Sequence, residues 1–231
     1  MGFIVILIIL ALIGAGYYFY KSSPMSDSKE VKERCKGRTP EQKSVIRYFC
    51  VDGCFSKKMN DAQYDALVKE TISKIDFRQK ALAKIGLDES ELKEIDPVHF
   101  EGYVFEGKKS FSKRGKDDLW RSSAYQITWL FFSSTQVYLY QNTLNLDEDG
   151  KKEITEEYFY KDITNFSTST DTVETSYWNV KQKKYLLENV DSNRFALTVP
   201  GDKFYCSMEQ NEYTERAIQA MKAKLREKKN A

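Results

Sequence analysis

The chain is poor in the residues and motifs that most enzymes use for catalysis. It has one histidine, His99, so Ser-His-Asp and Cys-His schemes would both have to run through that residue. It also lacks a Walker lysine motif, a G-x-G-x-x-G loop, an H-E-x-x-H motif and a C-x-x-C pair. His99 follows Pro97 at the start of an expected strand, where a surface or capping role is favoured. We therefore expect a binding protein that is not an enzyme and needs no cofactor, with catalysis through His99 as the alternative.

An excess of one charge is also missing. The chain has 36 Lys and Arg against 34 Asp and Glu, which gives a formal charge of +2. Proteins dedicated to nucleic-acid binding usually carry a strong basic excess. The composition therefore predicts no nucleic-acid partner.

Four cysteines permit several interpretations. An even number allows two disulfides outside the cell, whereas cytoplasmic thiols stay reduced. The spacing of Cys50 and Cys54 fits no ordinary zinc finger, so no metal site is predicted. Free thiols are favoured for all four, including Cys35 and Cys206. In an oxidising compartment, Cys50–Cys54 or Cys35–Cys50 would be the natural bridge.

Residues 147–150, Asp-Glu-Asp-Gly, superficially suggest a calcium loop. An EF-hand needs a bidentate acid in the correct register of a helix–loop–helix, and none is expected here. We therefore interpret this segment as a solvated acidic turn between strands.

Long hydrophobic runs are absent except at the N-terminus, where residues 3–20 contain no charged side chain. Roughly 18 to 20 helical residues span a hydrocarbon core of about 30 Å. A secretory signal peptide is the alternative, but no basic n-region precedes the run and no A-x-A motif closes it. We therefore expect a transmembrane anchor over residues 1–21 that contacts membrane lipid. Its interfacial anchor is a group of aromatic and basic side chains: Tyr17, Tyr18, Tyr20 and Lys21.

The charges that flank this run predict an orientation. Basic residues follow it closely: Lys21, Lys29, Lys32, Arg34, Lys36 and Arg38. The positive-inside rule then places the soluble domain in the cytoplasm of a single-pass protein of the cell membrane. The opposite orientation would make the chain an extracytoplasmic, disulfide-containing envelope protein with a structural role.

The segment between the anchor and the first strand divides into two parts. Residues 22–40 are expected to be a polar tether because they are rich in serine and charge. Residues 41–97 are expected to be helical, with a short helix over 41–50 and a longer one over 61–85. Asn60 is a suitable N-cap for the longer helix, and Gly86 is a suitable stop.

From His99 the hydrophobic period changes to two, which is typical of strands. We expect about seven antiparallel strands and then a helix over residues 212–228, within a domain of residues 98–231. Eight segments are candidates for these strands: 99–106, 124–132, 136–141, 153–160 and 163–175, and the weaker 184–188, 194–199 and 203–207. The predicted fold class is α+β with a sandwich or barrel core.

Residues 120–229 resemble bacterial pleckstrin-homology-like (PH-like) domains. The resemblance lies in a tight turn at 133–135 followed by the β-rich segment 136–140, and in an aromatic strand that leads into Asp162-Ile163. It implies a seven-stranded barrel with a C-terminal helix that acts as a binding platform without catalysis. The turn at 133–135 carries no Lys or Arg, unlike the loop of phosphoinositide binders in this superfamily. The resemblance therefore implies a peptide contact at an edge of the barrel or in the groove beside its helix.

Residues 107–118 form a predicted basic loop. Its candidates for contact with an anionic membrane surface are Lys108, Lys109, Phe111, Lys113, Arg114 and Lys116. Each charge near such a surface contributes about 1 kcal/mol. A flexible charged loop without a ligand is the favoured alternative. The sequence as a whole predicts a single-pass, membrane-anchored binding or scaffolding module with a protein partner whose identity is open.

Overall fold

Helices precede the strands along the chain, and one helix follows them. The computed structural model describes residues 29–51, 58–88, 90, 92, 95–106 and 110–230. The N-terminal helices are α2 (Lys29–Arg34), α3 (Pro40–Cys50), α4 (Asp61–Ser73) and α5 (Phe77–Ile85). The strands are β1 (Val98–Tyr103), β2 (Ser112–Arg114), β3 (Trp120–Ser122), β4 (Ala124–Phe132), β5 (Gln136–Asn145), β6 (Lys151–Phe159), β7 (Asn165–Asn179), β8 (Lys184–Val199) and β9 (Asp202–Ser207). The C-terminal helix is α6 (Glu212–Asn230).

Side-chain caps set the bounds of the N-terminal helices. The Asn60 side chain accepts a hydrogen bond from the backbone N–H of Gln63, whose side chain accepts one from the Asn60 N–H, so a capping box starts α4. The single helix predicted over residues 61–85 is wrong, because Asp76 caps a second helix by accepting from the Gln79 N–H. The predicted stop is confirmed: Gly86 ends α5 with φ of 79°, a left-handed conformation.

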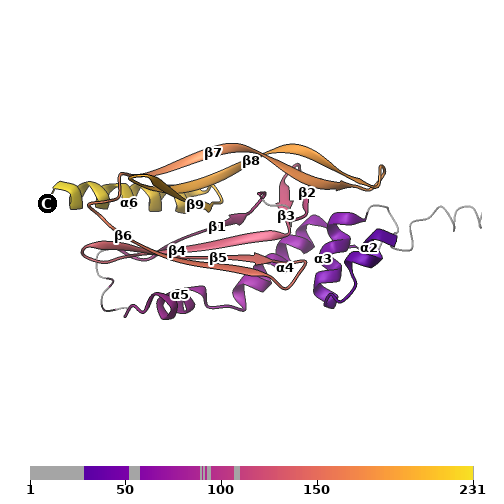
Figure 1. Cartoon of the computed structure of the whole chain (residues 1–231), viewed down its shortest axis with the longest axis horizontal. Coiled ribbons are helices and arrows are strands. Elements are labelled where there is room, and N and C mark those ends of the chain that lie inside the picture. Colours follow the sequence, from indigo (N-terminus) through magenta and orange to yellow (C-terminus); the bar gives the residue numbers. More distant parts are fainter. Residues whose placement is uncertain are drawn as a thin grey trace, which may run out of the picture.

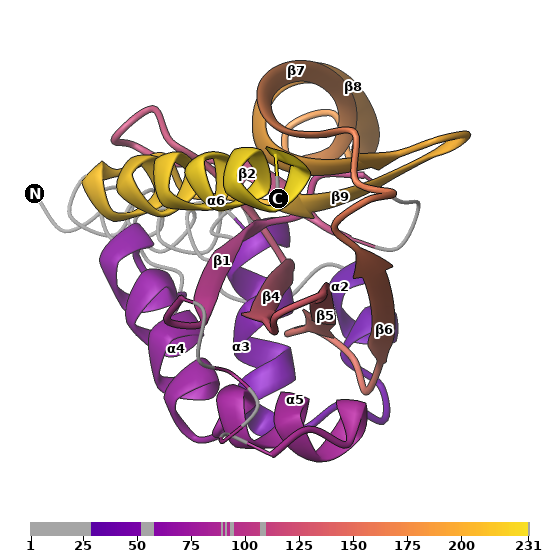
Figure 2. The same ribbon diagram turned by 90° about the vertical axis from the view of Figure 1, so that its left-hand side faces the viewer.

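The strands form two sheets. The first sheet has the antiparallel order β1-β4-β5-β6, and the second has the order β3-β2-β7-β8-β9. β7 and β8 form a hairpin that pairs continuously from Asn165↔Thr198 to Asn179↔Lys184. Figure 1 shows this hairpin running along the long axis of the molecule, and Figure 2 shows its strong coiling in the view along that axis.

The first sheet lies between two packed layers. Figure 2 shows α3, α4 and α5 on one of its sides and the second sheet with α6 on the other. The helical side is filled by a core that includes Tyr48, Tyr64 and Phe131, which are fully buried. The opposite side contains a second core, in which Phe195 of β8 and Met221 of α6 are fully buried. The chain is therefore an α+β fold with a hydrophobic core on each side of one sheet.

Two features of the predicted β domain are wrong. The described residues form nine strands in two sheets rather than a seven-stranded barrel. Part of the predicted basic loop is the strand β2, which pairs with β3 just after the loop. The predicted break between residues 188 and 194 is also absent. Side-chain bonds across the hairpin, from Thr170 to Asn193 and from Thr172 to Asp191, hold these polar residues in β8.

Part of the predicted polar tether is folded. α2 lies within residues 22–40, and its Val31 is 1 % exposed. The valine belongs to the core on the helical side of the first sheet, so the segment from residue 29 onward is part of the packed structure.

The prediction of a membrane-spanning helix is corrected. No helix in the described ranges combines the length and the apolar character needed to cross a bilayer. The expected anchor, residues 1–21 with Tyr17, Tyr18, Tyr20 and Lys21, lies outside the described residues. The finding leaves the predicted transmembrane fold class, the single-pass membrane protein and its cell-membrane localisation without support.

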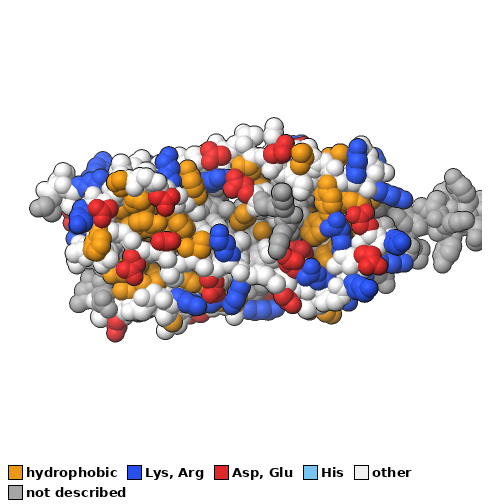
Figure 3. Space-filling model, in the orientation of Figure 1, with side chains coloured by type: hydrophobic (Ala, Val, Ile, Leu, Met, Phe, Trp, Pro, Cys, Tyr) orange, Lys and Arg blue, Asp and Glu red, His pale blue; other side chains and the backbone are white. Residues whose placement is uncertain are grey.

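The surface shows a mixture of side-chain types. On the face drawn in Figure 3, hydrophobic side chains gather in two areas toward opposite ends of the long axis, with acidic and basic side chains among them. Large hydrophobic residues with high exposure include Leu119 (62 %) and Leu187 (63 %).

Candidate binding groove

A groove of about 840 Å³ lies between the long hairpin and the N-terminal helices. One wall is β8, and the other is formed by α4 and the β2–β3 hairpin. Its floor comes from β1, β4 and the segment after β9, through residues that include Gly102, Tyr103, Tyr125 and Met208. We call this hollow the β8 groove.

The β8 wall of the groove is a sheet edge. Six consecutive residues, Glu188–Asn193, line it, whereas β7 contributes Thr172. β9 pairs with β8 only from Arg194 to Val199. In the described part of the chain no strand pairs with β8 before Arg194 on the side away from β7. The groove therefore runs along an unpaired stretch of β8.

Hydrogen bonding fixes which backbone groups of β8 face this groove. The Met208 N–H donates to the Asn193 carbonyl at 3.0 Å on the side away from β7. Both backbone groups of a strand residue point to one side, and successive residues alternate. Asn189 and Asp191 therefore direct their N–H and C=O groups away from β7, and Val190 directs its groups toward β7.

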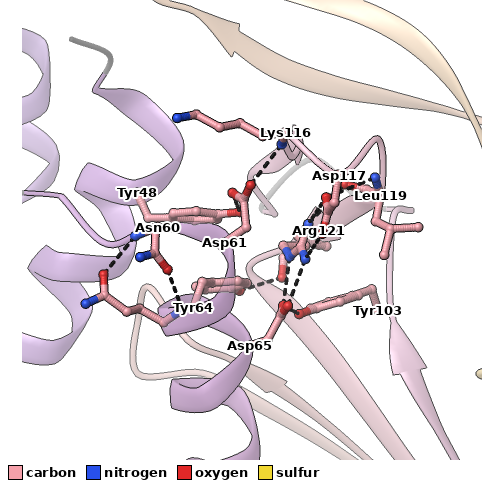
Figure 4. Close-up of polar contacts among 12 residues, drawn as sticks. Tyr48, Asn60, Asp61, Tyr64, Asp65, Tyr103, Lys116, Asp117, Leu119 and Arg121 are labelled. Atoms are coloured by element: carbon pink, nitrogen blue, oxygen red, sulfur yellow. Dashed lines mark hydrogen bonds and ion pairs between the residues drawn. The ribbon is translucent and has the colours of Figure 1, made fainter. Parts of the chain in front are cut away.

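Arg121 organises the opposite wall, and its side chain is 3 % exposed. The guanidinium donates from Nε and Nη2 to the two carboxylate oxygens of Asp65 in α4, both at 2.7 Å. It also donates from Nη1 and Nη2 to Asp117 at 2.9 and 2.7 Å. The Tyr103 hydroxyl donates to Asp65 at 3.1 Å. Figure 4 shows Arg121 between the two carboxylates; we call these four residues the Arg121 network.

The start of α4 is held to the β2–β3 hairpin by a second carboxylate. Asp61 accepts from the Tyr48 hydroxyl at 2.9 Å and from the Lys116 backbone N–H at 2.8 Å (Figure 4). One turn later, the Tyr64 hydroxyl donates to the Ser122 carbonyl at 2.7 Å. These bonds and the Arg121 network fix the wall opposite β8.

Burial and charge shift the titration of groups around the groove. Hydrogen bonding to Arg121 holds the pKa of Asp117 well below its ordinary value. Burial, and then the charge of Asp65, raise the pKa of Tyr103. The Asp117 carboxylate and the Arg121 guanidinium are therefore charged at neutral pH, while the Tyr103 hydroxyl stays protonated.

Glu209, which lines the floor of the groove just after β9, lies close to Glu101 of β1. The Glu209 N–H donates to the Glu101 carbonyl at 2.8 Å, and the Tyr125 hydroxyl donates to the Glu209 carboxylate at 3.2 Å. Burial and the nearby charge of Glu209 raise the pKa of Glu101, and Lys69 partly opposes them. Glu209 therefore places a carboxylate at this end of the β8 groove.

A second hollow of about 550 Å³ adjoins the first and lies beside α6. It lies between Thr168–Thr170 of β7 and the helix, and it shares Asn193, Met208 and Gln210 with the β8 groove. The sequence resemblance implied a groove beside the helix. The larger hollow, however, lies at the other end of this shared floor.

The described residues of the predicted basic loop do not lie on one surface. Lys108 and Lys109 lie outside the described residues. Phe111 is 9 % exposed, its ring stacks 6.2 Å from that of Phe49, and the Arg34 guanidinium lies 5.2 Å from its centre. Its burial removes Phe111 from the candidate contact surface.

The remaining basic residues of the loop lie on the β2–β3 hairpin. The Lys113 ammonium donates to the Tyr48 carbonyl at 3.0 Å and lies over the aromatic ring of Tyr48. The exposed Arg114 pairs with Asp118 at 3.4 Å and lines the β8 groove. Lys116 is exposed, and its backbone N–H donates to the Asp61 carboxylate. Contact of these side chains with lipid stays a prediction.

His99 lies among aromatic side chains. Its ring stacks on Trp129 with centres 4.9 Å apart, and Nδ1 is 3.2 Å from the Tyr213 hydroxyl. Burial lowers the pKa of His99, which favours the neutral imidazole. These contacts give His99 a packing role at the junction of β1 and α6.

The three described cysteines, Cys35, Cys50 and Cys206, are buried and form no disulfide with one another. Burial raises the pKa of Cys50 to about 12, so its thiol is protonated and unreactive at neutral pH. The Cys35–Cys50 bridge considered from the sequence is absent. Cys54 lies outside the described residues.

The acidic turn at residues 147–150 is not simply solvated. Asp147 is 4 % exposed, and its Oδ1 has no hydrogen-bond partner among the described residues. Glu148 pairs with Arg38 at 3.1 Å, and Asp149 accepts from Gln42 at 2.7 Å. The turn therefore anchors the start of α3.

No group of three or more metal-binding side chains occurs in the part of the chain that the structure describes.

Comparison of the chain with family models, curated proteins and solved structures finds no match.

Proposed function

We propose that this protein is a binding module whose partner is an extended polypeptide segment that pairs with the unpaired edge of β8. The observation that carries the proposal is the backbone of Glu188–Asn193, which lines a groove of about 840 Å³ without a neighbouring strand on that side in the described part of the chain. Addition of a strand to such an edge is a general mode of peptide recognition.

The dimensions and chemistry of the β8 groove suit a peptide. Six strand residues span about 20 Å at about 3.3 Å each, which is enough for several main-chain hydrogen bonds. The groove also offers aromatic surface from Tyr103 and Tyr125, and exposed apolar surface from Leu119. Alternate side chains of an added strand would meet the floor and the solvent.

The Arg121 network supports the proposal by fixing the wall opposite β8. Two carboxylates and a buried guanidinium hold α4 and the β2–β3 hairpin together, so this wall is formed before a partner arrives. A preformed site loses less conformational entropy on binding. The resemblance to PH-like domains is compatible with this binding role and stays a prediction.

A single proline substitution tests the proposal. Asn189→Pro removes an N–H that points away from β7, and proline is tolerated at sheet edges of this kind. Asn189→Ala removes the side chain but keeps the N–H, so it is the matched control. Peptides of about 12 residues would be selected from a random library on the full-length protein and measured by fluorescence polarisation.

We expect selected peptides to bind the wild type and Asn189→Ala within about twofold of each other, and Asn189→Pro at least about tenfold more weakly. Circular dichroism would establish that both variants fold. Equal binding to all three proteins would contradict strand addition at β8. A wild-type dimer in sedimentation that Asn189→Pro disperses would show instead that a second copy of the chain occupies the edge.

A further inference from the structure

The acidic side chains that line the β8 groove outnumber the basic ones. Five acidic and three basic side chains line it, a net charge of −2 in a chain whose formal charge is +2. Two of the basic side chains are already engaged, because Arg121 pairs with Asp65 and Asp117, and Arg114 pairs with Asp118. The third is Lys69.

Three carboxylates of the groove have no cationic partner among the described residues: Glu188, Asp191 and Glu209. Within the described ranges, the Asp191 carboxylate accepts only from the Thr172 hydroxyl, at 2.9 Å, and the Glu209 carboxylate only from the Tyr125 hydroxyl, at 3.2 Å. Hydroxyl donors leave the negative charge in place. Glu188 and Asp191 are exposed, so both can contact a ligand.

The carboxylates lie where an added strand would place its side chains. Glu188 and Asp191 belong to the β8 stretch whose edge is unpaired, and Glu209 lies on the floor beside it. Opposite charges on paired strands stabilise the pairing, whereas like charges destabilise it. The aromatic rings of Tyr103 and Tyr125 also favour a cation over an anion in the same groove.

From this arrangement we infer that the partner segment is basic, with lysine or arginine side chains that meet Glu188, Asp191 and Glu209. The inference rests on the proposed strand addition at β8 and adds the chemical class of the partner. An acidic segment would bring its carboxylates against unpaired carboxylates and is excluded by the same charges.

Charge reversal tests this inference. The probes are the peptides of about 12 residues selected on the full-length protein, together with copies in which each Lys or Arg is replaced by Gln. Glu188→Lys/Asp191→Lys reverses two exposed charges on β8. Glu156→Lys/Glu157→Lys makes the same change in net charge at exposed positions of β6, away from the groove, and is the matched control.

We expect Lys and Arg to be enriched over Asp and Glu among the selected peptides. The β8 double variant should weaken their binding at least about tenfold, and the β6 variant by less than about twofold. The Gln copies should lose affinity for the wild type and show little difference between the wild type and the β8 variant.

Other outcomes separate the two proposals. Peptides that lose binding on Asn189→Pro but show no basic preference would overturn the inference and leave strand addition standing. Basic peptides that respond to charge reversal but bind Asn189→Pro as well as Asn189→Ala would overturn strand addition. Equal effects of the β8 and β6 variants would show that the preference reflects net charge, and would overturn the inference.

Discussion

At the scale of single residues, Arg121 combines a buried side chain with two carboxylate partners. Its side chain is 3 % exposed and contacts two carboxylates that are 35 % and 42 % exposed. A buried cation of this kind is stabilising only as long as its partners stay in place. The network therefore makes the position of the groove wall depend on one side chain.

Replacing Arg121 by alanine should lower the free energy of unfolding by about 2–3 kcal/mol, because two carboxylates lose their shared cation and charge-assisted hydrogen bonds. Urea unfolding followed by circular dichroism would measure the change. The control is Arg114→Ala on the same hairpin: its side chain is 54 % exposed and that of its partner Asp118 is 81 % exposed, so this variant should stay within about 0.5 kcal/mol of the wild type. Equal effects of the two variants would refute a special role for Arg121.

Glu101 lowers the stability of the folded protein at neutral pH, whereas Arg121 raises it. Its pKa is raised above the ordinary value of 4.5 by burial and by Glu209. The folded protein therefore holds this proton at pH values where the unfolded chain has released it, so stability falls as the pH rises through the folded-state pKa.

Glu101→Gln should accordingly raise the urea midpoint at pH 7, and its advantage should shrink as the pH falls through the folded-state pKa of Glu101 and be lost below the ordinary value of 4.5. Glu156→Gln, at an exposed position of β6, controls for the loss of one negative charge. An advantage of Glu101→Gln that stays constant with pH would argue against the titration of Glu101 as its cause.

At the scale of elements, local signals in the sequence predicted the helices better than they predicted the hairpin. Asn60 and Gly86 marked a start and a stop that the structure confirms, because caps act within one turn. β8 could not be predicted at full length, because Asn189 and Asp191 are typical of turns and are held in the strand by pairing with β7. The contact between Arg121 and Asp65 carried no local signal, since Asp65 lies 56 residues before Arg121.

The close approach of β1 to the segment after β9 offers a test at this scale. A Cβ atom on Gly102 would lie 3.1 Å from the Met208 backbone nitrogen, which is too close for ordinary contact. Gly102→Ala should therefore push the floor of the groove apart, lower stability by about 1–2 kcal/mol and weaken peptide binding.

The control for Gly102→Ala is Gly150→Ala. The nearest atom to its new Cβ belongs to the flexible Asn145 side chain, so its effect should stay within about 0.5 kcal/mol. Full peptide affinity in a stable Gly102→Ala variant would show that the floor of the groove does not contact the ligand.

At the scale of the whole molecule, the fold class α+β was predictable, but the arrangement of its layers was not. Period-two patterning identifies strands without stating which sheet each one joins. The long hairpin spans the molecule and leaves part of β8 unpaired because β9 is only six residues long. The candidate site follows from this difference in strand length, which becomes visible only when the strands are placed side by side.

Amide hydrogen exchange along β8 tests the central claim most directly. In the free protein, the N–H groups of Val190 and Ser192 should exchange slowly because they face β7, and those of Asn189 and Asp191 should exchange fast. On addition of a selected peptide, the fast pair should become protected while the slow pair changes little. Asn189 and Asp191 amides that stay fast in the saturated complex would contradict the addition of a strand to β8.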